Sequence, residues 1–95
     1  MKEPGYVEET LRWCNARRKE QGKEPLDKLP KGVRGKGTSC PCGAATGLFV
    51  AVSQYWEITN VATRIIQSKK FLPRSVTRFV MAFDRGRLPQ YDIDA

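Results

Sequence analysis

The segment between Pro73 and Gly86 constrains the fold most, because it carries the clearest helix signal in the chain. Four apolar residues recur at the i, i+3, i+4, i+7 spacing of one helical face: Val76, Phe79, Val80 and Phe83. Pro73 suits the first helical position, and Gly86 suits the position just after the last turn. The pattern predicts an amphipathic helix over 73–86 that docks its Val/Phe stripe on a sheet and points its arginines into solvent.

The opposite face of this predicted helix is basic. Arg74, Arg78 and Arg85 lie roughly 180° from the apolar stripe, at about 100° of rotation per residue. Met81 lies beside them, so it places an apolar group on the face that points away from the core. An isolated exposed methionine is common on ordinary surfaces, but one flanked by arginines indicates a contact with a partner.

A second helix is predicted over residues 6–21. Val7, Leu11 and Cys14 share one face, and Gly22 suits the helix stop. Tyr6, Trp13 and Arg17 form another stripe, about 100° around the same helix. If it is exposed, this stripe has the composition of a protein-binding hot spot. The alternative, which we favour for Trp13, is that its ring closes the edge of the core.

Residues 23–39 read as a long, flexible connection, because its prolines and glycines break regular structure. We expect Leu26, Leu29 and Val33 to pack against the domain and hold this loop in place. Residues 39–47 predict a short helix that Ser39 or Cys40 caps, with Pro41 in its first turn and Gly47 at its end.

Two strands are predicted after the short helix, near 49–53 and 56–61, with a tight turn around Gln54. Val50, Val52, Trp56 and Ile58 have the same parity, so they could face one side of a sheet. Together these elements predict a single α+β domain over residues 1–95. Its order is N-terminal helix, long loop, short helix, two-stranded antiparallel hairpin or small sheet, C-terminal amphipathic helix, and a short acidic tail over 88–95.

The residues that carry most enzyme chemistry are sparse. The chain has no histidine, which removes the commonest general base and a common zinc ligand. Cys14, Cys40 and Cys42 give one C-x-C pair, whereas structural zinc sites use paired C-x₂₋₄-C spacing. The glycine-rich segment 32–37 does not match a phosphate loop. We therefore expect no catalytic residue, no metal, no cofactor and no small-molecule substrate.

The cysteine count also bears on location. An odd number of cysteines does not suit a disulfide framework, and no apolar run resembles a signal peptide or a membrane span. The sequence therefore predicts reduced thiols in a cytoplasm, without membrane contact.

Basic residues are concentrated in two segments. The 95-residue chain has a formal net charge of +7, with 17 lysines and arginines against 10 acids. Residues 15–36 contribute a net +5 and residues 64–87 a net +6. If the two segments fold onto one side, they form a surface that attracts phosphates. Nucleic-acid binding is thus an alternative function, although no nucleic-acid-binding motif is present.

Three segments together resemble a group of small uncharacterised proteins from actinobacteria and their bacteriophages. They are Leu-Pro-Lys-Gly at 29–32, Ser-Cys-Pro at 39–41, and Arg-Phe-Val-Met-Ala-Phe-Asp-Arg-Gly at 78–86 followed by Leu-Pro at 88–89. Cys42 stands where this group has an aliphatic residue, which weakens a shared metal site. The group has no established activity, so the resemblance implies only context, that of a phage or prophage accessory gene. A mycobacteriophage protein of this type binds the host's DivIVA-like polar growth protein and excludes superinfecting phages.

These observations favour a binding protein over an enzyme. We expect a non-enzymatic phage accessory protein that binds a host protein, such as a DivIVA-like polar growth protein, and modulates its function. The oligomeric state is left open. The residues expected to bind the partner are Tyr6, Trp13, Arg17, Arg74, Arg78, Met81 and Arg85.

Overall fold

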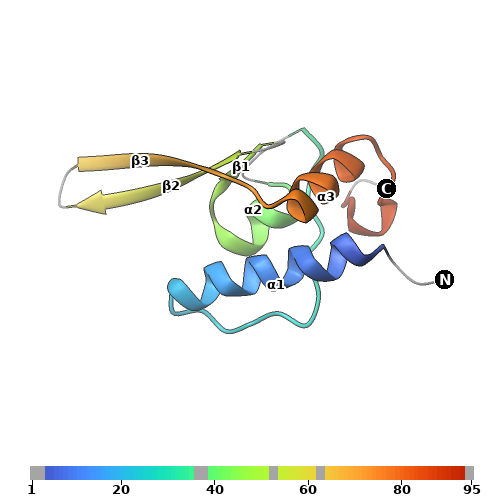
Figure 1. The fold of residues 1–95 in the computed structure, drawn as a ribbon, viewed down its shortest axis with the longest axis horizontal. Coiled ribbons are helices and arrows are strands. Elements are labelled where there is room, and N and C mark those ends of the chain that lie inside the picture. Colours follow the sequence, from blue (N-terminus) through green and yellow to red (C-terminus); the bar gives the residue numbers. More distant parts are fainter. Residues whose placement is uncertain (1–3, 36–38, 52–53, 62–63, 94–95) are drawn as a thin grey trace.

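The computed structural model describes residues 4–35, 39–51, 54–61 and 64–93 of the chain. Among these residues two helices are followed by a run of strands and then by a third helix, as in an α+β fold, which confirms the predicted class (Figure 1). The elements are α1 (Gly5–Glu20), α2 (Pro41–Thr46), β1 (Phe49–Val50), β2 (Gln54–Val61), β3 (Arg64–Phe71), α3 (Arg74–Asp84) and a 3₁₀ turn, η1 (Pro89–Tyr91).

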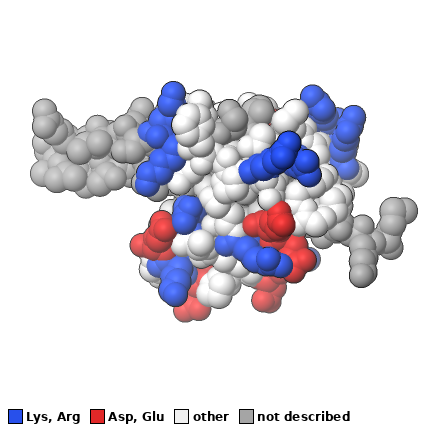
Figure 2. All heavy atoms as spheres, in the orientation of Figure 1, with Lys and Arg blue, Asp and Glu red and all other residues white. Residues whose placement is uncertain are grey.

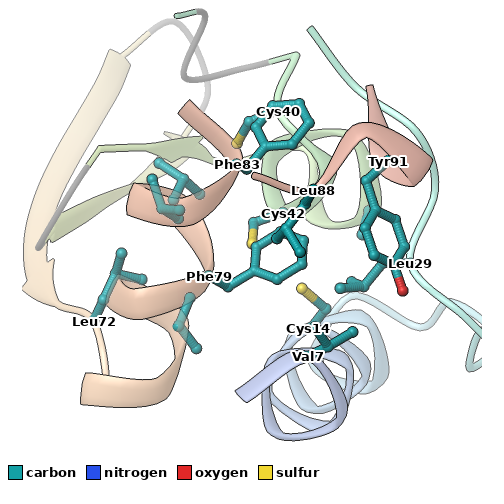
Figure 3. Close-up of a cluster of buried hydrophobic side chains, with 14 of the residues drawn as sticks. Val7, Cys14, Leu29, Cys40, Cys42, Leu72, Phe79, Phe83, Leu88 and Tyr91 are labelled. Atoms are coloured by element: carbon teal, nitrogen blue, oxygen red, sulfur yellow. The ribbon is translucent and has the colours of Figure 1, made fainter. Parts of the chain in front are cut away.

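The apolar stripe of α3 is buried in the centre of the core, but the predicted docking on the sheet is wrong, because α3 packs mainly against α1. Val76, Phe79, Val80 and Phe83 are all buried. The ring of Phe79 lies 5.6 Å from that of Tyr91 and 6.5 Å from that of Phe83. Side chains from α1, the long loop, α2 and the C-terminal segment close around these rings (Figure 3).

The predicted helix ends are also confirmed. Gly86 follows α3 with a φ of 74°, and Gly22 follows α1 with a φ of 73°. Each glycine thus adopts the left-handed conformation that lets the chain leave a helix without a Cβ penalty. Cys40 caps α2 by accepting a hydrogen bond from the Gly43 amide through its Sγ.

The sheet has three antiparallel strands in the order β1-β2-β3. The hairpin of β2 and β3 projects away from the helices and makes the molecule elongated, 47 × 25 × 24 Å (Figure 1). The predicted turn near Gln54 is confirmed, since the Ala51 amide donates to the Gln54 carbonyl. Strand β3 was not predicted, because its sequence lacks apolar alternation and Asn-Gly or Asp-Gly does not precede it.

The predicted common face of Val50 and Trp56 is wrong. In the β1–β2 register Val50 lies opposite Tyr55, and Trp56 lies opposite Phe49. Directly opposed residues share a face of the sheet, so Val50 and Tyr55 are on one face and Trp56 is on the other. The chain reversal before Gln54 changes the parity between the two strands. Val52, which was grouped with them, lies outside the described residues.

The long loop is fastened to the domain at several points. Asn15 of α1 exchanges two side-chain hydrogen bonds with the backbone of Leu26, at 2.8 and 3.0 Å. Leu29 is buried and Leu26 packs against the core, as expected for residues that hold the loop against the domain. The Gly32 amide donates to the Tyr91 carbonyl, and the Gly32 carbonyl accepts from the Ile93 amide. The loop therefore lies beside the C-terminal segment.

The C-terminal segment is part of the core. Leu88 and Tyr91 are buried. Asp92 is also buried, and its carboxylate pairs with Arg34 of the loop at 2.9 Å. The acidic tail foreseen over 88–95 thus contributes apolar packing and an internal ion pair.

Gly32 is required by the close approach of two backbone segments. A Cβ at this position would lie within 2.6 Å of the Cys40 carbonyl carbon and as close to the backbone of Ser39 and Pro41. We expect Gly32→Ala to lower the free energy of unfolding by about 1–3 kcal/mol, because backbone atoms must move to admit the methyl group. Urea unfolding followed by circular dichroism measures this loss.

Gly5→Ala is the matched control, since a Cβ at Gly5 meets nothing within 4 Å. This variant should unfold at the wild-type urea concentration or slightly above it. Equal stability of the Gly32 and Gly5 variants would contradict the close approach.

Candidate binding surface on helices α1 and α3

The outward face of α3 carries the residues that its sequence placed there. Arg74, Arg78 and Arg85 are exposed, and Met81 is half-buried among them. The arginines are held out by the burial of the Val/Phe stripe on the other side of the helix. An apolar side chain thus lies within a basic helical face.

Tyr6, from the first turn of α1, joins this face. Two adjoining open hollows, of about 300 and 260 Å³, both include Tyr6 and Arg78 in their walls. Arg74 and Glu9 line the first hollow, while Met81 and Arg85 line the second. Ala82 and Arg87, which sequence reasoning did not single out, complete the second hollow. We name this region the α1/α3 surface.

The charge around the α1/α3 surface is strongly asymmetric. In Figure 2 acidic side chains lie among basic ones in the lower part of the view, around α1, whereas the charged groups in the upper part are basic; Glu9 lines the first hollow. No carboxylate among the described residues forms a salt bridge with Arg74, Arg78 or Arg85. These guanidinium groups are therefore available to an acidic ligand.

Trp13 and Arg17 lie elsewhere, toward the other end of α1. The Trp13 ring packs edge-on against Tyr55 of β2, with 5.0 Å between centroids, and borders the core. The Arg17 guanidinium lies 5.4 Å from the centre of the Trp13 ring and pairs with Glu20. The structure therefore brings five of the seven predicted residues together and places these two in a separate cluster beneath the sheet.

Three of the eight basic residues in 15–36 are engaged in hydrogen bonds or ion pairs within the protein. Arg18 donates to the carbonyls of Glu24 and Ala45, which ties α1 to the loop and to α2. Arg17 and Arg34 each pair with a carboxylate. The other described basic residues of this segment, Lys19, Lys23, Lys28 and Lys31, are exposed, so both segments contribute positive charge to the surface.

The three cysteines meet in the core (Figure 3). All three are free and buried, and the Cys42 thiol lies between those of Cys14 and Cys40. Hydrogen bonding with Cys14 and Cys40, together with burial, raises the pKa of Cys42 well above its ordinary value. The hydrogen bond with Cys42 lowers the pKa of Cys40, against the effect of burial.

The described residues contain no group of three or more Cys, Asp or Glu side chains arranged to hold a metal ion. None of their helices has the length and apolar character needed to cross a bilayer.

Packing against Tyr55 makes Trp13 a structural residue. We expect Trp13→Ala to destabilise the fold by about 2 kcal/mol, less than a fully buried tryptophan would, because the ring is half-buried. Trp13→Phe keeps an aromatic ring beside Tyr55 and should lose less than half of that. Thermal unfolding compares the two variants, and an unchanged midpoint for Trp13→Ala would contradict the assignment.

The raised pKa of Cys42 predicts a dependence of stability on alkaline pH. The folded chain retains this proton more tightly than the unfolded chain, whose thiols titrate near pH 9.0. The stabilising contribution is therefore complete below pH 9.0 and declines above it, by up to about 1.4 kcal/mol per pH unit. Urea unfolding across this range should show a steeper decline in wild type than in Cys42→Ala. Parallel declines would refute the prediction.

The chain was compared with protein-family models, curated proteins and solved structures, and none of them matches it. The resemblance to actinobacterial and phage proteins therefore stays a prediction.

Proposed function

We propose that this chain is a non-enzymatic binding protein that captures a partner protein on the α1/α3 surface. In the context suggested by the sequence resemblance, it is a phage accessory protein that acts in the bacterial cytoplasm on a host protein. The presence of three free thiols is in keeping with a reducing compartment. A DivIVA-like polar growth protein is the first candidate partner.

One observation carries this proposal. Tyr6 and Met81 come from different helices, yet they line a common hollow whose rim is formed by arginines. Aromatic and arginine side chains around an apolar centre are the composition of binding hot spots. An unpaired guanidinium can make bidentate contacts with a carboxylate and thereby orient a partner.

The same arrangement indicates the chemistry of the partner. An acidic segment would pair with Arg74, Arg78 and Arg85, and charge complementarity would accelerate the encounter. An apolar side chain of that segment would enter the hollow beside Met81. Exclusion of water at this point would then supply most of the affinity.

Substitution of Met81 tests the surface. Met81→Glu puts a carboxylate where the partner's acidic segment would dock, so we expect capture of the partner to weaken at least tenfold, or about 1.4 kcal/mol. Wild-type and variant proteins would be immobilised and exposed to nuclease-treated actinobacterial lysate. Captured proteins would be quantified by mass spectrometry, with the DivIVA-like protein also tested in purified form.

Ile93→Glu is the matched control, because Ile93 is an apolar residue that is 61% exposed and lies outside both hollows. A genuine partner of the α1/α3 surface is retained by Ile93→Glu and lost by Met81→Glu. Capture of the same proteins in equal amounts by both variants would dispose of the proposed surface.

A further inference from the structure

The base of the projecting hairpin carries a second, chemically different surface. Phe71, the last residue of β3, is 76% exposed. Exposure of so large an apolar ring is costly in water and marks a contact site when charged residues surround it. Lys69 and Lys70 precede it, and Arg74 follows three residues later; all three basic residues are exposed.

The strand register places Phe71 on the same face of the sheet as Trp56. Trp56 of β2 lies opposite Lys69, and Gln54 lies opposite Phe71. Opposed residues share a face, as do alternate residues along a strand. One face of the hairpin base therefore presents Gln54, Trp56, Lys69 and Phe71.

The other face of the hairpin base is the one that packs on the domain. Tyr55 is buried and contacts Trp13 of α1. Leu72, which continues the chain from Phe71, is buried as well. The Trp56/Phe71 face accordingly points away from the core, and Trp56 itself is only half-buried.

We propose that the Trp56/Phe71 face binds single-stranded nucleic acid by stacking bases on its aromatic rings. Bases stack on aromatic side chains without regard to sequence, and adjacent lysines and arginines neutralise the phosphates. Here Lys69 lies opposite Trp56 and two residues before Phe71 on the same face, and Arg74 stands at the start of α3. A binding site of this kind goes beyond the protein-binding function proposed above, and of the residues named for it only Arg74 also belongs to the α1/α3 surface.

Charge favours nucleic acid over a protein as the occupant. Lys69 and Arg74, which precede and follow Phe71 in the chain, are exposed, and no acid lies between them. An ordinary protein surface presents both signs of charge, whereas a nucleic-acid strand presents a phosphate at every nucleotide. Aromatic rings beside cations match the alternation of bases and phosphates along such a strand.

The test uses Trp56 as its own reporter. Trp13→Phe leaves Trp56 as the remaining tryptophan of the chain, which has two. We expect its fluorescence to be quenched when an oligothymidylate of about 10 nucleotides, within the site size of known stacking grooves, is added at low salt. Log K should fall with log salt with a slope of about −0.7 for each phosphate contact.

In this background Phe71→Ala should weaken binding by about fivefold or more, the contribution of one stacked base. Phe71→Trp restores a ring, so its binding should be measured by electrophoretic mobility shift and should equal that of Phe71. Ile93→Ala is the control, because it truncates an exposed apolar residue away from the sheet. Circular dichroism would verify that each variant is folded.

Three results would overturn the proposal. They are an absence of binding at low salt, equal binding by the Phe71→Ala and Ile93→Ala variants, and equally tight binding of polyglutamate, which would indicate attraction to any polyanion. Met81→Glu separates the two proposals. It should weaken partner capture on the α1/α3 surface at least tenfold and leave oligonucleotide binding unchanged, whereas Phe71→Ala should do the reverse.

Discussion

The stacking of other elements on Phe79 and Phe83 is the interaction on which this fold depends. A chain of this size buries a limited area, so one small core must hold every element. The stripe of α3 supplies the centre of that core, and Cys14 of α1, Leu29 of the loop and Tyr91 of the C-terminal segment belong to the same buried cluster. Because the stripe fixes the rotation of α3, it also fixes the outward position of Arg74, Arg78 and Arg85.

Sequence reasoning recovered the parts of the fold that carry local signals. Helix α3 has a periodic stripe, a proline before its first turn and a glycine after its last. Helix α2 has a capping residue, Pro41 in its first turn and Gly47 in the left-handed conformation at its end. Strand β3 has no such signal, because its two lysines are adjacent and its isoleucines are consecutive. Its strand conformation comes from pairing with β2 along the whole of its length.

The candidate site was likewise predictable where a local sequence pattern determines it, and not where it depends on contacts between distant segments. The spacing of α3 was sufficient to place Met81 among arginines. Tyr6, Trp13 and Arg17 share a helical stripe, but eleven residues of helix span about 16 Å, so the two ends of the stripe meet different elements. Tyr6 reaches α3, whereas Trp13 reaches Tyr55. Tyr6 and Trp13 are separated because α1 packs against α3 at one end and beneath the sheet at the other, which the helical stripe alone does not show.

The burial of the three sulfurs has a consequence for the chemistry of the whole chain. Cys14 and Cys42 have no exposed surface, and Cys40 has almost none. An alkylating reagent or an oxidant can therefore reach them only when the core opens, however reactive the Cys40 thiol is once exposed. The rate at which these thiols react therefore measures how often the core opens, and no added label is needed to follow it.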